Sequence, residues 1–322
     1  MTDERFRTTR LGPLALGCAP LGGLFRPVSD DQAVATVDAA WEAGVRAFDV
    51  APQYGAGRAE ERLGAALRGR PRSELVVSTK VGRLVVPPAG RRDPGLRIFA
   101  DGGDRDVAFD FSADGVRRSL EASLHRLGLD RVDVLHVHDP DDHLDQAIAE
   151  AFPALLRLRD EGVIGAVGAG MNRAEPLLRI VDQVDVDCIL LAGRWSLLDR
   201  SAGSQLLPRC QERGVAVVVG GVFNSGVLLD PTPGATYDYA PASPEVLARA
   251  QAIRARCAEH GVAPATAAMR FPFRHPAVAA VVVGARAPEE IRENVAAFRR
   301  PVPDELWATL DERRAVAAPH DR

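Results

Sequence analysis

The feature that most constrains the fold is a regular alternation of short apolar runs with longer segments of helical pattern. Eight runs, rich in β-branched residues, have the length and composition of buried parallel strands. They are Leu14–Cys18, Ala47–Asp49, Leu75–Lys80, Val132–His138, Ile164–Gly168, Cys188–Ala192, Val215–Val219 and Ala279–Val283. Eight β–α units in 322 residues favour a closed (β/α)8 barrel with extended βα loops over an open doubly wound sheet. No linker-like break interrupts the pattern, so we expect residues 1–322 to form a single barrel domain.

Local signals set the helix boundaries. Ser29 and Gln32 have the spacing of a capping box, and Ser243 and Pro244 have the types favoured at an N-cap and at a first helical position. The predicted helices cover residues 30–43, 58–68, 113–127, 142–161, 175–181, 203–213, 244–260, 288–299 and 303–317.

One segment, Arg83–Phe111, is too long and too polar for an ordinary connection. It follows the third predicted strand, on the side where active sites of such barrels are built. Two interpretations remain open: a loop that covers the substrate, or a plain surface insertion.

Composition excludes several classes of function. A formal net charge of −4 gives no basic footprint, so nucleic acid is not an expected partner. The four cysteines are scattered without a Cys-x-x-Cys pair, which argues against a zinc site and a disulfide framework and fits a reducing cytoplasm. The N-terminal residues are charged, and no apolar run approaches the roughly 20 residues that span a bilayer. We expect a cytoplasmic protein without a membrane partner.

Reactive side chains stand at the ends of three successive strands. Asp49, Lys80 and His138 close the second, third and fourth predicted strands, and Tyr54 lies in the loop after Asp49. The carboxyl ends of parallel strands gather on one face of a barrel, so these four groups are expected to converge.

Their chemistry suits a carbonyl–alcohol pair. A free tyrosine titrates near 10, and a neighbouring ammonium favours its phenolate. Lys80 supplies that ammonium, Asp49 has the charge to pair with Lys80, and a neutral His138 can orient a substrate oxygen. None of the four is a hydride donor or acceptor, so redox chemistry here requires a cofactor.

Plainer interpretations of the same residues also exist. Asp49 and Lys80 could form an ordinary buried ion pair, and Tyr54 could pack on the rim. His136 and His138 point the same way from one strand, so a metal is geometrically allowed. No other ligand cluster supports a metal, and none is expected.

Three glycine-rich loops follow later strands. Residues 165–170 lack the Gly-x-Gly-x-x-Gly spacing, because position 173 is arginine. Residues 220–226 and 284–290 follow the seventh and eighth strands, where barrels often bind phosphate. Each loop alone is weak evidence, because connections in such folds need glycine anyway.

Taken together, the chain resembles the aldo-keto reductase family over almost its whole length. The matching elements, in the order of the family, are Phe48–Gly55, Ser78–Lys80, Leu135–Asp139, Val167–Asn172 and Val282–Asn294. The resemblance implies a (β/α)8 barrel that binds a nicotinamide cofactor in extended form. It also implies a catalytic tetrad in which Tyr54 is the general acid/base, Lys80 and Asp49 tune it, and His138 orients the substrate.

Within the family, the chain is most similar to the branch of sugar 1-dehydrogenases and pyridoxal 4-dehydrogenases. The shared residues are Lys80–Arg83, Phe109–Gly115, His138–Asp141 and Phe223–Gly226. The resemblance implies oxidation of a cyclic hemiacetal, such as L-fucose, D-arabinose or pyridoxal, to a lactone. Three alternatives stay open: a pyridoxal 4-dehydrogenase, an NADPH-dependent aldehyde reductase, and a non-catalytic sensor subunit that keeps the cofactor site.

The resemblance also places the cofactor contacts. They are Asn172, Gly221, Phe223, Ser225, Gly226, Gly284, Arg286, Glu290 and Asn294. NAD is the expected cofactor and NADP the alternative, because Glu290 would repel a 2′-phosphate whereas Arg286 could meet one. The aromatic residue that often stacks on nicotinamide corresponds to Gly220, and neither Phe223 nor Trp195 can be assigned that role from sequence.

Overall fold

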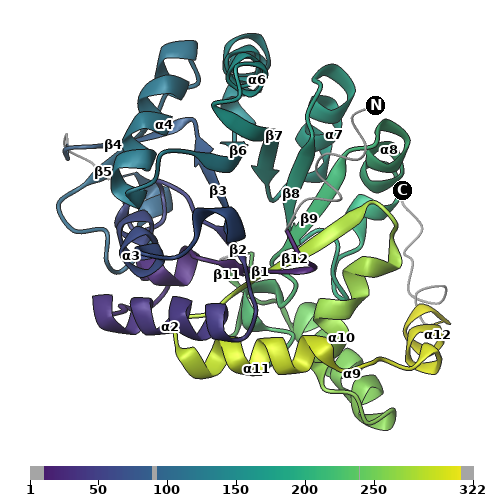
Figure 1. The fold of residues 1–322 in the computed structure, drawn as a ribbon. Coiled ribbons are helices and arrows are strands. Elements are labelled where there is room, and N and C mark those ends of the chain that lie inside the picture. The colour runs from purple at the N-terminus through teal and green to yellow at the C-terminus, as the bar shows by residue number, and fades with distance from the viewer. Residues whose placement is uncertain (1–10, 89–92, 239, 313–322) are drawn as a thin grey trace.

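The computed structural model describes residues 11–88, 93–238 and 240–312. Its centre is a closed barrel of parallel strands in the order β1-β12-β9-β8-β7-β6-β3-β2, seen in Figure 1. The strands are β1 (Leu14–Gly17), β2 (Ala47–Asp49), β3 (Val76–Val81), β6 (Val132–His138), β7 (Ile164–Met171), β8 (Cys188–Ala192), β9 (Ala216–Gly220) and β12 (Val278–Gly284). Every strand predicted from the sequence is present, which confirms the barrel.

Helices surround the barrel, with α2 and α11 side by side along one flank (Figure 1). They are α2 (Asp30–Glu42), α3 (Arg58–Leu67), α4 (Ala113–Leu127), α5 (Leu144–Gln146), α6 (Phe152–Asp160), α7 (Ala174–Gln183), α8 (Leu206–Arg213), α9 (Pro244–Glu259), α10 (Pro264–Arg270), α11 (Pro288–Arg299) and α12 (Asp304–Glu312). Helix α10 was not predicted. A π-helical turn, Ala147–Ala151, separates α5 from α6. The predicted end of the last helix, residues 313–317, lies outside the described residues.

The capping predictions are confirmed for one helix and only half correct for another. Ser243 accepts a hydrogen bond from the Val246 amide at 3.4 Å. Ser29 likewise accepts from the Gln32 amide at 3.1 Å. The Gln32 side chain does not return to Ser29; its Nε2 donates to the Arg286 carbonyl at 2.9 Å and ties α2 to the loop after β12.

Period-two alternation along the strands separates two apolar layers. Small and medium side chains, among them Ala15, Ala47 and Val282, form a cluster inside the barrel. Their neighbours in sequence, such as Leu16 and Phe48, belong to a larger cluster beneath the helices. Each fully buried Leu, Val or Phe contributes about 1.5–3 kcal/mol.

The long segment after β3 contains secondary structure that was not predicted. Its ends pair as an antiparallel hairpin of β4 (Arg83–Val86) and β5 (Asp106–Phe109). Between them, Leu96 and Phe99 are buried. An isolated bridge joins Phe99 to Leu24, so the middle of the segment is fastened back onto the barrel end.

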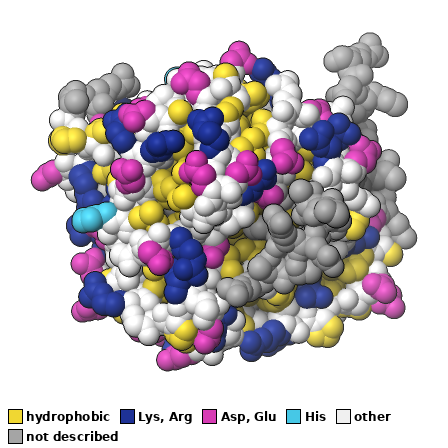
Figure 2. All heavy atoms as spheres, turned by 45° about the horizontal axis from the view of Figure 1, so that its top comes forward, with side chains coloured by type: hydrophobic (Ala, Val, Ile, Leu, Met, Phe, Trp, Pro, Cys, Tyr) yellow, Lys and Arg dark blue, Asp and Glu magenta, His cyan; other side chains and the backbone are white. Residues whose placement is uncertain are grey.

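A second small sheet lies in the segment after β9. It consists of β10 (Thr236–Tyr237) and β11 (Ala240–Pro241). The face in Figure 2 intersperses Lys and Arg with Asp and Glu, without a broad field of one sign. In the part of the chain that the structure describes, no helix has the length and apolar character to cross a membrane.

Candidate active site

The alternation that fills the barrel also decides which side chains reach its carboxyl end. The last inward position is Asp49 in β2, Lys80 in β3 and His138 in β6. In β7 and β9 the corresponding position is Gly170 or Gly220. One half of this barrel end therefore carries reactive groups, whereas two strands of the other half, β7 and β9, end inward on glycine.

Lys80 is the centre of the reactive half. Its Nζ donates to Asp49 Oδ2 at 2.7 Å, to the Val50 carbonyl at 2.9 Å and to the Tyr54 hydroxyl at 3.2 Å. The side chain is 1% exposed. Burial alone would lower the pKa of Lys80, but the Asp49 carboxylate and Tyr54 outweigh burial and raise this pKa above its ordinary value. Lys80 is therefore protonated at neutral pH, and its ammonium group contacts the Tyr54 oxygen.

Asp49 is fixed from its other side. Ser78 Oγ donates to Asp49 Oδ1 at 2.7 Å. Ser78 stands two residues before Lys80 on the same face of β3, so all three groups follow from one strand pairing. Ser78 belongs to the family motif Ser78–Lys80 but was not predicted as a site residue, although the period-two rule applied to β3 places it on the face of Lys80.

Tyr54 is held by a tight loop and by aromatic neighbours. Gly55 has φ +62°, and a Cβ there would lie 2.5 Å from the Gly22 carbonyl oxygen, so only glycine fits. The Tyr54 ring stacks on Phe99 at a centroid distance of 5.8 Å and meets the His138 ring edge-on at 6.0 Å. The middle of the long segment therefore touches the proposed acid/base. No sequence signal assigned Phe99 this place.

His138 is uncharged at neutral pH. Burial lowers the pKa of His138 well below 6.5, and the cations Arg83 and Lys80 lower it further. Its Nδ1 is buried and has no hydrogen-bond partner within the described chain. A neutral imidazole beside Tyr54 can hold a substrate oxygen without competing for the proton.

The same strand carries His136 one layer deeper. Burial lowers the pKa of His136 to about 4, so this ring is neutral as well. Among the described residues, no group of three or more His, Cys, Asp or Glu side chains could hold a metal ion.

The ends of β7 and β9 carry no side chain at their last inward positions. A Cβ added at Gly170 would lie 3.5 Å from Lys80 Cε, and one at Gly220 would lie 3.6 Å from Leu190 Cδ2. Both are ordinary contact distances, so a Cβ at either position would touch its neighbours without a clash. Nearby, Asn224 Oδ1 is buried and has no hydrogen-bond partner among the residues that the structure describes, while its Nδ2 donates to the Gly193 carbonyl at 3.3 Å.

The predicted cofactor residues other than Asn172 lie in two groups, after β9 and after β12. Gly221, Phe223, Ser225 and Gly226 form the turn after β9, where Ser225 adopts a left-handed conformation with φ +58°. Gly284, Arg286, Glu290 and Asn294 form the end of β12 and the first turns of α11, and Asn294 Nδ2 donates to the Gly284 carbonyl at 3.4 Å. The amide and hydroxyl groups, together with the N-terminus of the 12-residue helix α11, fit a ligand with a carboxamide and phosphates.

Arg286 and Glu290 interact with each other. Glu290 Oε2 accepts from the Arg286 amide at 2.9 Å, and its Oε1 lies 3.6 Å from Arg286 Nε. An anion that approaches Arg286 therefore has to compete with a carboxylate already in place.

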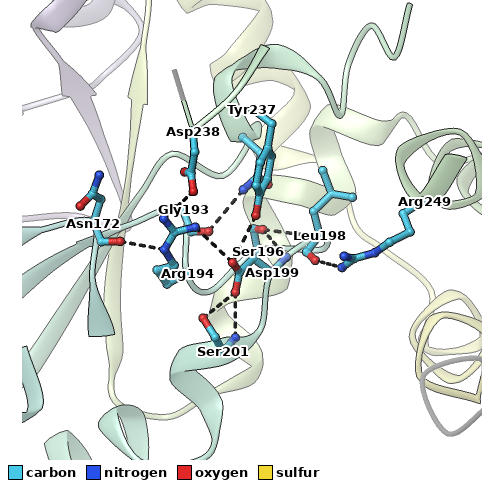
Figure 3. A network of polar contacts seen from close by, with 11 residues as sticks. Asn172, Gly193, Arg194, Ser196, Leu198, Asp199, Ser201, Tyr237, Asp238 and Arg249 are labelled. Carbon is cyan, nitrogen blue, oxygen red and sulfur yellow. Dashed lines mark hydrogen bonds and ion pairs between the residues drawn. The ribbon is translucent and has the colours of Figure 1, made fainter. Parts of the chain in front are cut away.

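Asn172, the remaining predicted contact, is held by a network that the sequence did not reveal (Figure 3). Arg194, just after β8, donates from Nε to the Asn172 carbonyl at 2.7 Å. Its other nitrogens bind Asp199 at 3.2 Å and Asp238 at 2.5 Å, and the Tyr237 hydroxyl also donates to Asp199 at 3.2 Å. Arg194 thus connects the end of β7 to the β10–β11 segment.

Two aromatic residues near this region, Trp195 and Phe223, pack against other parts of the protein. Trp195 packs against Phe271 at 5.0 Å and donates from Nε1 to the Pro272 carbonyl at 3.1 Å. Phe223 packs against both large apolar clusters. Neither gains a stacking role from these contacts.

Comparison with known proteins gives the same picture. Residues 13–315 match the model of the Aldo/keto reductase family. The chain is 43% identical over 312 residues to a D-threo-aldose 1-dehydrogenase from Pseudomonas sp, with 95% of each chain covered. It is 44% identical over 316 residues to a pyridoxal 4-dehydrogenase from Microbacterium luteolum, with 92% of each covered.

A solved structure with the same fold is the glycerol dehydrogenase of Gluconobacter oxydans. Its TM-score is 0.74 at 25% identity, over 96% of this chain and 93% of that one. The structure and the comparisons confirm the family resemblance seen in the motifs, and the chain belongs to the aldo/keto reductase family of nicotinamide-dependent oxidoreductases.

Proposed function

We propose that this protein is an NAD-preferring dehydrogenase that oxidises the hemiacetal carbon of a small cyclic aldose to a lactone. The observation that supports this most directly is the contact chain Asp49–Lys80–Tyr54, with the ammonium 3.2 Å from the phenol oxygen. A fixed cation at that distance favours the phenolate, which is the form that removes a proton from an alcohol.

Each residue of the tetrad has a defined task in this proposal. Tyr54, as phenolate, takes the proton of the anomeric hydroxyl, and neutral His138 holds the oxygen that becomes the lactone carbonyl. Lys80 stabilises the phenolate, and Asp49 keeps Lys80 charged and in place. A bound nicotinamide supplies the acceptor for the hydrogen and two electrons that leave the same carbon.

The preference for NAD rests on the pair Arg286–Glu290. A 2′-phosphate would have to displace Glu290 from the arginine and then lie beside a carboxylate, whereas ribose hydroxyls can donate to Glu290. We assign Asn172 to the carboxamide, the turn 221–226 and the start of α11 to the phosphates, and Glu290 to the ribose.

The names of two relatives favour an aldose: D-threo-aldose 1-dehydrogenase, and L-galactose dehydrogenase from Arabidopsis thaliana, 34% identical over 294 residues. The pyridoxal 4-dehydrogenase relative supports a second candidate, pyridoxal, which also presents a cyclic hemiacetal. The same tetrad serves both substrates, so the residues that meet the rest of the substrate decide between them.

The test is a panel assay at the absorbance band of reduced nicotinamide. Aldoses, pyridoxal and simple aldehydes are compared with NAD and NADP in both directions. We expect the highest kcat/KM with an aldose and NAD. A higher value with pyridoxal would select the second candidate, and activity confined to aldehyde reduction with NADPH would contradict both. Nucleotide binding without any turnover would indicate a sensor.

A further inference from the structure

Asp139, the residue after His138, has an unusual backbone. Its φ is +40°, in the left-handed region that residues other than glycine, asparagine and aspartate rarely adopt. Its amide still donates to the Gly170 carbonyl at 3.0 Å, so the pairing of β6 with β7 continues up to this point. Such strain tends to persist where the position of a side chain is functionally constrained.

This backbone brings the carboxylate of Asp139 back to the imidazole of its neighbour. Asp139 Oδ2 lies 3.5 Å from His138 Nε2. The same oxygen accepts a hydrogen bond from Arg83 Nη2 at 3.1 Å. A carboxylate and a guanidinium therefore stand directly beside the imidazole that we assign to the reacting oxygen.

Arg83 reaches this position from the long segment. It is the first residue of β4 and is 8% exposed, with its guanidinium 4.9 Å above the Phe109 ring. Its Nε is buried and has no hydrogen-bond partner among the described residues. The guanidinium thus retains a donor that the protein does not use.

The pair does more than anchor the hairpin. Oδ2 takes both contacts, and Oδ1 of Asp139 makes no hydrogen bond with another described residue. The Asp139 side chain remains 29% exposed, against 10% for Arg83, so the carboxylate is open on one side. An ion pair that served only as an anchor would gain nothing from an open acceptor and a strained backbone.

We propose that Asp139 and Arg83 form a hydroxyl-binding subsite that selects cyclic aldoses with a free hydroxyl on the carbon next to the reacting one. Oxygens on adjacent ring carbons lie about one hydrogen-bond length apart, close to the 3.5 Å between His138 Nε2, which can donate to the reacting oxygen, and the acceptor Asp139 Oδ2. Asp139 accepts from the hydroxyl, and Arg83 donates to its oxygen. The inference rests on the proposed aldose oxidation and names its specificity determinants.

The experiment compares two matched substrate pairs with NAD: L-fucose with 2-deoxy-L-fucose, and D-arabinose with 2-deoxy-D-ribose. A site that hydrogen-bonds a hydroxyl discriminates strongly against an analogue without it. We expect wild type to prefer the parent sugars by roughly 10- to 100-fold in kcat/KM. A preference below about 2-fold would overturn the subsite while leaving aldose oxidation intact.

Two substitutions separate specificity from folding. Asp139→Gly removes the carboxylate and suits the left-handed backbone, whereas Asp139→Asn keeps a carbonyl acceptor at a position that asparagine tolerates. Asp139→Gly should reduce kcat/KM on the order of 10-fold more for the parent sugar than for the deoxy sugar, mainly through a higher KM for the parent sugar. The ratio of the two kcat/KM values in Asp139→Asn should lie between those of Asp139→Gly and wild type. Asp114→Asn, at the exposed pair with Arg118, is the control and should keep the wild-type ratio.

The ratio should also depend on pH. Burial raises the pKa of Asp139 to about 6, with Asp141 raising it further and Arg83 and Lys80 opposing the shift. His138, whose pKa is depressed, stays neutral over that range. As pH falls through about 6, Asp139 takes up a proton and the preference for the parent sugar should decline.

Equal losses on parent and deoxy sugars in Asp139→Gly, with an unchanged pH dependence of the ratio, would reduce the pair to a structural anchor. A wild-type enzyme that is active on other substrates but on neither parent sugar would overturn the proposed aldose oxidation, and the subsite with it.

Discussion

The two halves of the barrel end are built in different ways. In the half formed by β2, β3 and β6, side chains of neighbouring strands contact one another directly, and Lys80 and Asp49 are 1% and 6% exposed. In the half formed by β7, β8 and β9, the last inward positions carry no large side chain. Loop residues such as Arg194 and Asp238 make the contacts there, at 18% and 41% exposed. Asp49, Lys80 and His138 are fixed by the register of the barrel, with Tyr54 beside them in the loop after β2, whereas the proposed cofactor contacts lie mainly on loops.

The difference has an energetic consequence. Removing one partner of a buried ion pair costs about 3–5 kcal/mol, because the other charge stays buried alone. Removing one partner of a partly exposed pair typically costs less than about 1 kcal/mol. The pairs that hold the loops are therefore expected to contribute less to stability than the buried pair that holds Lys80.

The largest expected effect is on the proton-transfer group itself. Tyr54→Phe should lower kcat by about 10²–10⁴-fold, the range for loss of a positioned acid/base, with little change in the dissociation constant of NAD. Steady-state kinetics and a fluorescence titration with NADH provide the two measurements. Activity within a few-fold of wild type would remove Tyr54 from the mechanism.

Lys80→Met tests whether turnover and stability both depend on the contacts among Asp49, Lys80 and Tyr54. Turnover should fall comparably, and any remaining activity should require a higher pH, because the phenolate loses its neighbouring cation. The free energy of unfolding should fall by about 3–5 kcal/mol, since Asp49 is left as an unpaired buried charge.

The double variant Lys80→Met with Asp49→Asn is the matched control. It should regain part of the unfolding free energy in urea titrations without regaining turnover. Wild-type stability of the single variant would mean that the pair is not buried as described.

The contrast between the halves also explains what the sequence could reveal. Asp49, Lys80 and His138 were found because each ends an apolar run, and β-strand periodicity brings such positions together. Tyr54 followed from its place in the loop after Asp49. The prediction of the tetrad depended on sequence patterns that each lie within about 15 residues and on the order of the strands.

The rest depended on contacts between distant segments. Arg194 binds Asn172 and Asp238, which are 22 and 44 residues away, and no local pattern marks the three as partners. The hairpin of β4 and β5 was not predicted, because its strands have only four residues each and are separated by a long polar stretch of the chain. Asp139 was quoted within a motif, but its left-handed backbone is visible only in the structure.

A smaller effect is expected at the nucleotide end of the loop-built half. Glu290→Arg should shift kcat/KM from NAD toward NADP by about 1–3 kcal/mol, because it frees Arg286 and adds a second base. Glu289→Arg, one position earlier on α11 and 74% exposed, is the control for added charge alone. If both variants shift the preference equally, general electrostatics and not the pair with Arg286 governs the choice, and a wild type that already prefers NADP would contradict the assignment of Glu290.

The smallest expected effect concerns the network around Arg194. Arg194→Met removes the donor to the Asn172 carbonyl and leaves Asp199 and Asp238 without their shared cation. Because the network is partly exposed, we expect the dissociation constant of NAD to rise only about 10-fold, or about 1.4 kcal/mol, and kcat at saturating NAD to stay within a few-fold.

The control is Arg209→Met, because Arg209 lies on α8 and forms an exposed pair with Asp182; this variant should change neither quantity. Tyr237→Phe, which removes only the hydroxyl that donates to Asp199, should lie between this control and Arg194→Met. A large loss of kcat in Arg194→Met would break the comparison, because it would show that the loop-built half also positions the groups that transfer the proton.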